Sequence, residues 1–540
     1  MRVLLAAVLI PVAAMGQLSR TSETIDVNVV EIDVVVLDAQ GNPVPGLRAS
    51  DFDLRVGGHR RAITNFYPVN RRVDKSGAPA TAASDAVARR DYLVLFIDDL
   101  HLNQHEKKRV LEALRTFVQQ HVRLGTAAML VVSDGNVRIL EKFTEEPSRL
   151  IARIDALERQ PAGANEQERE RREVMQLIED LRPKPGDRAD NAEIALQNLE
   201  RYVHHQQLLT ESTIAALDRV TDAIKGLDGR RVMVYVSDGL PMQPGAEIYA
   251  WYKPEEFLGN TADPAKAALA QALPLDAQGV NLSTAFTRSA RQAALAGVQF
   301  FAVDARGVQG FDEETPSSGR SDSTASTQLD SGLIRSNLQS SIQLLADETG
   351  GQAITDTNDM NFAFDKLDEH LSSYYSLGFI SEGTGREDDI NVNVKRRGLT
   401  VRASKHVRQR TAREEIADRV RGALYARVES NPLEARVTMV PISSGVKATI
   451  HVPTPKLSIL PGSQSSFAVF VAMIDDQMRE TPVRMFVHRI GPTEVEDSMQ
   501  TLTLEAPPGS YTVSMAISDS YSLQVSYVQQ DVTIPAKPSS

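Results

Sequence analysis

The stretch Tyr92-Leu93-Val94-Leu95-Phe96-Ile97, followed directly by Asp98-Asp99, decides the fold of this chain. Six consecutive apolar residues, without the alternation of a half-exposed strand, predict a strand that is buried on both faces of a parallel sheet. Two comparable runs follow at 231–236 and 298–303, and an aspartate follows closely after each. Helical patterns separate the runs, so the sequence predicts a doubly wound, Rossmann-like α/β domain over residues 90–381.

Two insertions interrupt this predicted domain. Residues 158–205 contain the run Glu166-Gln167-Glu168-Arg169-Glu170-Arg171-Arg172-Glu173, whose mixed charges predict a solvated helical hairpin. The same pattern also fits a coiled-coil arm that binds a partner, and both interpretations stay open at this point. Residues 307–332 are rich in Ser, Gly, Thr and Asp, which predicts a mobile loop.

Strand patterns of period two flank the α/β region on both sides. Residues 17–69 predict an N-terminal β-sandwich, the polar residues 70–89 suit a linker, and 382–410 predict a β extension. After a helix near 411–427, the strands within 411–540 have the number and spacing of an immunoglobulin-like β-sandwich. The predicted fold class is therefore multidomain, with the α/β domain between N- and C-terminal β-sandwich domains.

The composition narrows the classes of protein to which this chain belongs. The 540 residues carry 59 basic and 71 acidic side chains, a formal net charge of −12, and contain no cysteine. The lack of cysteine excludes disulfide scaffolds, thiol catalysis and cysteine-ligated metals. The acidic balance argues against nucleic acid as a partner, because a nucleic-acid-binding protein needs a basic face.

The first residues predict export. Arg2 precedes an apolar stretch over 3–14, and the small residues Ala14 and Gly16 fit cleavage between Gly16 and Gln17. The signal peptide 1–16 is too short to span a membrane, and no later apolar run is long enough. We therefore expect a secreted or periplasmic protein with no transmembrane segment in its mature chain. A buried N-terminal strand is the alternative interpretation.

Further motifs occur in a fixed order along residues 25–405. They are Val36-Leu37-Asp38-Ala39-Gln40-Gly41-Asn42-Pro43-Val44 with Leu47 and Asp51-Phe52, Phe96-Ile97-Asp98-Asp99-Leu100-His101-Leu102, Phe301-Ala302-Val303-Asp304-Ala305-Arg306-Gly307, Leu345-Ala346-Asp347-Glu348-Thr349-Gly350-Gly351, Tyr374-Tyr375-Ser376-Leu377-Gly378-Phe379, and Lys395-Arg396-Arg397-Gly398-Leu399 with Val401-Arg402. Together they resemble the secreted bacterial family related to the von Willebrand factor type A domain. The resemblance implies that the α/β domain is of von Willebrand A type and that the protein binds a protein partner.

The resemblance also implies a metal site. In metal-binding A domains one divalent cation lies above the C-terminal edge of the sheet, held by Asp-x-Ser-x-Ser and by a Thr and an Asp from later loops. Here Asp98 matches the first aspartate and Asp238 the last, with Asp99 as a local substitute. Leu100 and Leu102 stand at the two serine positions and offer no oxygen, so the expected site for Mg²⁺, Mn²⁺ or Ca²⁺ is degenerate.

Other residues near the predicted edge leave its role open. Thr210 and Thr213 are candidates for the threonine ligand on spacing alone. Asp304 also ends a buried strand, and several carboxylates at one edge need a cation or hydrogen-bond donors to offset their repulsion. The alternative is that these aspartates cap the helices and turns that follow them.

Catalytic motifs are mostly missing from the sequence. No Gly-x-Ser-x-Gly, Walker A or Gly-x-Gly-x-x-Gly motif occurs. His101 and His105 have the spacing of zinc ligands, but Leu102 stands where a zinc protease needs a glutamate. We therefore expect a secreted, non-enzymatic binding or adhesion-type protein that presents its sheet edge to a protein partner. The alternatives are a cell-envelope structural or assembly factor that acts through 158–205 and, third, a hydrolase of unknown type.

Overall fold

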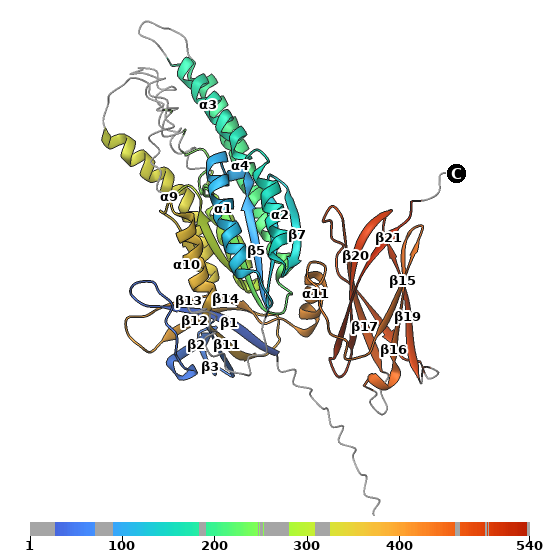
Figure 1. Ribbon diagram of the computed structural model, residues 1–540. Coiled ribbons are helices and arrows are strands. Elements are labelled where there is room, and N and C mark those ends of the chain that lie inside the picture. The colour runs from blue at the N-terminus through green and yellow to red at the C-terminus, as the bar shows by residue number, and fades with distance from the viewer. Residues whose placement is uncertain are drawn as a thin grey trace, which may run out of the picture.

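The described residues form three bodies of secondary structure (Figure 1). A helix-covered sheet stands in the centre, one β-sandwich lies below it, and a second lies beside it beyond the short helix α11 (Ala412–Gly422). This agrees with the predicted combination of an α/β domain with β-rich domains. The computed structural model describes residues 28–70, 90–182, 191–246, 248, 252, 280–307, 324–458, 465–491, 494 and 496–536. The predicted signal peptide 1–16, residues 71–89 of the predicted linker and residues 308–323 of the predicted loop lie outside the described residues.

The central sheet contains β5 (Asp91–Asp98), β6 (Thr126–Ser133), β7 (Val137–Thr144), β8 (Arg230–Ser237), β9 (Val298–Asp304) and β10 (Gln352–Ile354). Its strand order is β10-β9-β8-β5-β6-β7, and all neighbours are parallel except the antiparallel pair β6–β7. β5 lies between β6 and β8 and is buried at every position, as its unbroken apolar run predicts. The doubly wound α/β arrangement is therefore confirmed.

Helices cover both faces of this sheet. One face packs against α1 (Gln104–His121), α2 (Pro147–Glu158) and α10 (Met360–Ser372), through every second residue of β5. The other face packs against α4 (Ala192–Ile224), α8 (Ser283–Ala296) and α9 (Thr324–Thr349) through the alternate set. α9 begins at Thr324, inside the segment 307–332. The last nine residues of that segment are therefore helical rather than a loop.

A helical arm projects from the sheet domain (Figure 1). It consists of α3 (Ala164–Asp180) and the first half of α4, which pack together through a small apolar cluster. These helices correspond to the hairpin predicted for 158–205, but α4 does not end there. It continues to Ile224 and spans ~50 Å, so one helix belongs to both the arm and the sheet domain. Among the helices that the structure describes, none combines the length and apolarity needed to cross a membrane.

The first β-sandwich is built from both sides of the α/β domain. Its sheets have the orders β13-β1-β11-β4 and β14-β12-β2-β3. The separate N-terminal sandwich 17–69, the domain end at 381 and the β extension 382–410 are therefore wrong as boundaries, because these segments form one body. The strands are β1 (Asn28–Leu37), β2 (Phe52–Val56), β3 (His59–Arg61), β4 (Asn65–Asn70), β11 (Ser373–Ser381), β12 (Glu387–Val394), β13 (Thr400–Ala403) and β14 (His406–Arg408).

The error in these boundaries has a physical reason. A strand forms its ladder with at least one neighbouring strand, and alternation in the sequence predicts the strand without identifying that neighbour. β1 pairs with β11 from Asn28↔Ser381 to Val34↔Tyr375 and with β13 from Val34↔Ala403 onward. The α/β domain is thus inserted between two halves of one β-sandwich.

A second β-sandwich lies in the C-terminal region, where the sequence predicts an immunoglobulin-like β-sandwich within 411–540. Its sheets have the orders β15-β16-β19 and β18-β17-β20-β21. The strands are β15 (Arg436–Ile442), β16 (Gly445–Pro453), β17 (Ser466–Asp475), β18 (Arg484–Arg489), β19 (Asp497–Glu505), β20 (Gly509–Asp519) and β21 (Val525–Ile534).

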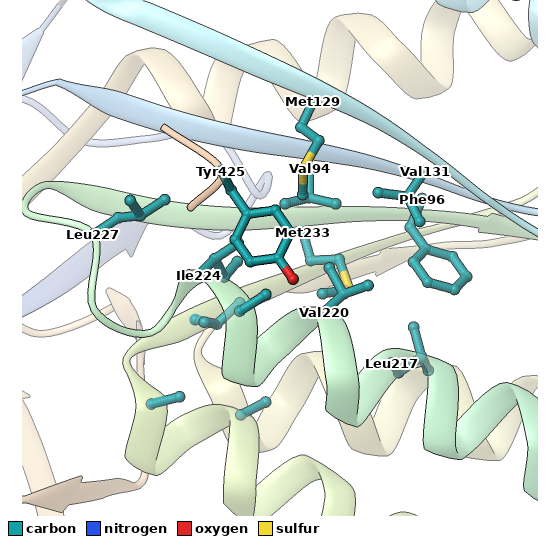
Figure 2. Close-up of a cluster of buried hydrophobic side chains, with 14 of the residues drawn as sticks. Val94, Phe96, Met129, Val131, Leu217, Val220, Ile224, Leu227, Met233 and Tyr425 are labelled. Atoms are coloured by element: carbon teal, nitrogen blue, oxygen red, sulfur yellow. The ribbon is translucent and has the colours of Figure 1, made fainter. Parts of the chain in front are cut away.

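The joint between α/β domain and second sandwich is apolar and close. Tyr425, just after α11, points into the cluster that contains Val94, Met233 and Ile224 (Figure 2). The same cluster includes residues of β17 and β20, so one core runs through both bodies. At Gly226 a Cβ atom would lie 1.9 Å from the carbonyl oxygen of Asp418, which leaves no space for any side chain.

Candidate functional site

The parallel strands bring three aspartates to one edge of the central sheet. Asp98 ends β5, Asp238 follows β8 and Asp304 ends β9, so all three lie at the C-terminal edge where open α/β sheets usually bind ligands. Their exposed fractions are only 0, 6 and 3%. The predicted residues Asp98 and Asp238 are thus brought to the same edge, but neither is open to a partner.

Asp98 is held by hydrogen-bond donors. Its Oδ2 accepts hydrogen bonds from the Tyr235 hydroxyl and from Ser237 Oγ, the second at 3.2 Å. The same oxygen pairs with His101 Nδ1 at 2.8 Å. Burial and the neighbouring Asp98 raise the pKa of Tyr235 well above its usual value, so the phenol stays a neutral donor. The Asp98 side chain does not cap the short helix that follows it. The predicted capping role does not apply to this aspartate.

Asp99 points to a different partner. Its Oδ1 lies 2.7 Å from Nζ of Lys107, and the side chains of both residues are almost fully buried. Lys107 Nζ also donates to the carbonyl oxygens of Gln160 and Pro161, at 3.2 and 3.3 Å. Burial raises the pKa of Asp99, although Lys107 acts in the opposite direction. The charge of Asp99 is therefore matched by a lysine and needs no cation.

Asp238 lies near two other acidic side chains, Glu106 and Asp304. Its backbone N–H donates to the His101 carbonyl at 3.1 Å, and its Oδ2 accepts from the backbone N–H of Asn103 at 3.3 Å. Burial raises the pKa of Asp238 to about 8, with Glu106 acting in the same direction and Arg306 against it. With no cation bound, this carboxyl therefore carries a proton at neutral pH.

Asp304 shows the capping behaviour that the sequence offered as an alternative. Its Oδ1 accepts from the backbone N–H of Arg306 at 3.1 Å, and its Oδ2 from Gln339 Nε2 at 2.9 Å. Burial raises the pKa of Asp304, and the bond from Gln339 opposes that rise. Both oxygens therefore have protein donors.

The donor set at this edge does not assemble the implied cation site. Leu100 and Leu102 are buried apolar side chains, and Thr210 Oγ1 donates to a carbonyl of its own helix. Buried oxygens without a hydrogen-bond partner do remain, on Asp98 (Oδ1), on Asp238 (Oδ1) and on Thr213 (Oγ1), the second threonine candidate. Across the described part of the chain, however, no three or more histidine, aspartate or glutamate side chains are placed to hold a metal. The cation stays a prediction that the residues in place do not favour.

The base of the arm closes the edge from above. The backbone N–H of Gly163 donates to the Asp99 carbonyl at 3.0 Å, and Gln167 Nε2 donates to the Leu100 carbonyl at 2.6 Å. A Cβ atom at Gly163 would lie 2.6 Å from that same Asp99 oxygen, so α3 begins in direct contact with the loop after β5. The site is a sealed polar core rather than an open cleft.

A second helix, α9, completes the cover beside β8. The backbone N–H of Leu240 donates to the Leu338 carbonyl at 3.2 Å, and Ser341 Oγ donates back to the Leu240 carbonyl at 2.6 Å. Gln339 of the same helix reaches Asp304. The loop after β8 is thereby pinned beneath α9.

Sequence reasoning missed the residues that neutralise this edge. Tyr235 is the one aromatic residue in the strand 231–236 and stands two positions before Ser237, which was the available signal for a polar partner at the strand end. Lys107 gave no such signal, because a lysine in the first turns of a helix is normally solvated. His101, weighed as a zinc ligand with His105, pairs instead with Asp98, and His105 is exposed.

Comparisons with known proteins place the chain in no family. No protein-family model and no curated protein matches it. An aerotolerance-related membrane protein of Bacteroides fragilis is 10% identical, with 52% of this chain and 98% of that chain covered at a TM-score of 0.23. The pilus adhesin SpaC of Lactobacillus rhamnosus GG is 10% identical, with 92% and 58% covered at 0.26. The ArnB paralog VWA2 of Sulfolobus acidocaldarius is 8% identical, with 94% and 76% covered at 0.21.

Proposed function

We propose that this chain is a non-enzymatic binding protein that contacts its protein partner through the helical arm of α3 and the first half of α4. The observation that carries the proposal is the continuity of α4, which runs without interruption from the sheet domain into the arm. A contact made on the arm is therefore held rigidly by the core, because the last third of α4 packs on the sheet. An arm joined by a loop would lack this rigidity.

The two helices of the arm share a small apolar cluster, to which Ile248 and Tyr252 also belong. Val174 and Ile178 of α3 pack against Ala195, Leu199 and Tyr202 of α4. The surface that remains is mixed, since charged residues surround the exposed apolar residues Ile194 and Leu208. Such a surface suits a reversible protein contact better than a permanent one, whose buried centre is more apolar.

The sequence predicts contact with a partner through the sheet edge. Because this edge is closed, we propose the arm as the contact surface instead. A partner carboxylate would have to displace the base of α3 and the α9 contact before it reached Asp98 or Asp238.

We also propose that the α/β domain is of von Willebrand A type and that the protein is exported. The ordered motifs and the sheet order support the first proposal, and the residues 1–16 support the second.

Site-specific photo-crosslinking of the full chain in its native cells tests the proposed surface. A photoreactive residue replaces Ile194 or Leu208, which are each 49% exposed, and the matched control replaces Val440 of β15, which is 51% exposed. We expect the two arm positions to give one shared crosslinked partner that the control position does not give. Crosslinks from Val440 alone, or from no position, would refute the arm as the contact surface.

A second comparison separates the arm from the sheet edge. The variant Glu193→Lys with Glu200→Lys reverses two exposed charges of the arm, and Asp98→Ala with Asp238→Ala removes the edge carboxylates. We expect the first variant to lose the crosslinked partner and the second to keep it, provided that its melting curve shows a folded chain. The opposite pattern would favour the edge.

A further inference from the structure

One edge of the second β-sandwich is open. β18 is the terminal strand of its sheet and pairs only with β17 among the described residues. Its six residues span ~20 Å, and the backbone N–H and C=O groups on its outer side have no ladder partner. Natural proteins usually shield such an edge, because it is a ready template for another strand.

The side chains of β18 form a row of mixed character next to this edge. The register pairs Met485 with Phe470 and Val487 with Ala468, so both side chains lie on the outer face of the sheet. Met485 is 36% and Val487 53% exposed. Arg489 continues the same row, since it is two positions further along the strand. The outer face of β18 is thus apolar at its centre and basic at one end.

The arginines at both ends of β18 have no partner among the described residues. Arg484 and Arg489 are exposed, and no hydrogen bond or ion pair to either guanidinium occurs in the described part of the chain. By contrast, nearby Arg479 pairs with Asp475 at 2.6 Å. In a chain of net charge −12, two free arginines that flank an open strand favour an acidic occupant.

We propose that β18 accepts one further strand from a partner protein, an extended acidic segment that alternates with apolar residues. The backbone of the segment completes the ladder of β18, its apolar side chains cover Met485 and Val487, and its acidic residues meet Arg484 and Arg489. This is strand addition, in which main-chain bonds supply affinity and alternate side chains supply specificity. It is a second contact surface, independent of the arm.

A second copy of the same strand does not fit. A second β18 strand contains no acidic residue, so it would bring two further arginines to the ladder and leave all four without an acidic partner. The charges therefore select a different, acidic strand.

Binding of a labelled peptide to the full chain tests the proposal. The probe is a ~10-residue peptide of alternating Val and Thr, long enough to cover one strand, in which two Glu residues stand five positions apart like Arg484 and Arg489. The control probe has Lys in place of Glu. By fluorescence anisotropy we expect the acidic probe to bind about tenfold more tightly than the control probe. Equal binding of both probes, or binding of neither, would overturn the proposal.

Hydrogen exchange and a pair of variants locate the bound probe. We expect the acidic probe to slow amide exchange within 484–489, and Val487→Lys to weaken its binding about tenfold, because an edge lysine blocks strand addition. Val440→Lys is the matched control, since Val440 lies on the edge strand β15 and is 51% exposed. Slowed exchange elsewhere, or equal loss in the control variant, would contradict the proposal.

Discussion

The two ends of the central sheet are closed by opposite kinds of contact. At the C-terminal ends of β5, β8 and β9, buried aspartates meet hydrogen-bond donors and the base of the arm covers them. At the other end, where Gly226 precedes β8, α11 and Tyr425 bring the apolar core of the α/β domain into contact with the second sandwich. One end is sealed by directed polar bonds and the other by apolar packing.

This difference between the two ends of the sheet indicates how the stability of each end should respond to substitutions and to pH. A buried charge is stable only while each of its partners is in place, since an unpaired one keeps its full desolvation penalty. Apolar burial is not directional and scales with area, so it joins two bodies without depending on a single atom. We therefore expect the polar end to respond to single substitutions and pH, and the apolar end to respond to loss of volume.

The largest effect should come from the polar end, at Lys107. Lys107→Ala leaves the Asp99 carboxylate buried without its partner and removes the donor to two carbonyls, which should cost about 3–5 kcal/mol of unfolding free energy. Urea denaturation measures the loss, and Lys108→Ala, at an exposed neighbour, is the control. The double variant Lys107→Met with Asp99→Leu should recover most of the stability. A loss below about 1 kcal/mol in Lys107→Ala would mean that the pair is not buried in solution.

At the apolar end, Tyr425 should have the next largest effect. Tyr425→Ala removes an almost fully buried ring from the shared core and should cost about 3 kcal/mol. Tyr425→Phe keeps the ring and loses only the bond of its hydroxyl to Glu480, so about 1 kcal/mol is expected. Calorimetry should also show the melting of the α/β domain and of the second sandwich further apart in temperature in Tyr425→Ala than in the original chain. Equal losses in the two variants would show that the hydroxyl, and not the packing, joins the bodies.

The stability of the folded chain should depend on pH through Asp238. The folded chain raises the pKa of this carboxyl from 3.8 to about 8, so the folded state binds a proton that the unfolded state has released. That contribution to stability is complete below about pH 4 and is lost as the pH rises through about 8. Asp238→Asn stays neutral, so its melting temperature relative to the original chain should rise between about pH 5 and about pH 9. A constant difference over this range would contradict the raised pKa.

The smallest expected effect is that of a divalent cation. Titration calorimetry of the full chain with Mg²⁺, Mn²⁺ or Ca²⁺ should give no saturable heat, because Asp98 is engaged by donors and Asp99 by Lys107. Saturable heat that disappears in Asp98→Ala would restore the cation site implied by the family resemblance. The full chain in metal-free buffer provides the baseline.

Local patterns predicted the elements of the fold but not all of its bodies. The apolar run of β5 predicted a central parallel strand, and the charges of 166–173 predicted a helical hairpin, because burial and helical amphipathicity are local properties. The pairing of β1 with β11 was not predictable in this way, since its partners are hundreds of residues apart in sequence. Similarly, Asp98 and Asp238 were predicted at one edge from topology, whereas their closure by Gly163 and Gln167 depends on how the arm folds back.

By itself, then, the sequence determined the layered α/β class, the positions of the strand-end aspartates, the helical nature of the arm and the lack of any cysteine chemistry. These follow from residue type and period, which act over a few neighbouring residues. Only the tertiary structure decided that the two flanks of the α/β domain make one sandwich, that Lys107 pairs with Asp99 while Tyr235 donates to Asp98, and that β18 is left open. Each of these depends on which distant segment occupies the space beside a strand, and that choice is set by packing of the whole chain.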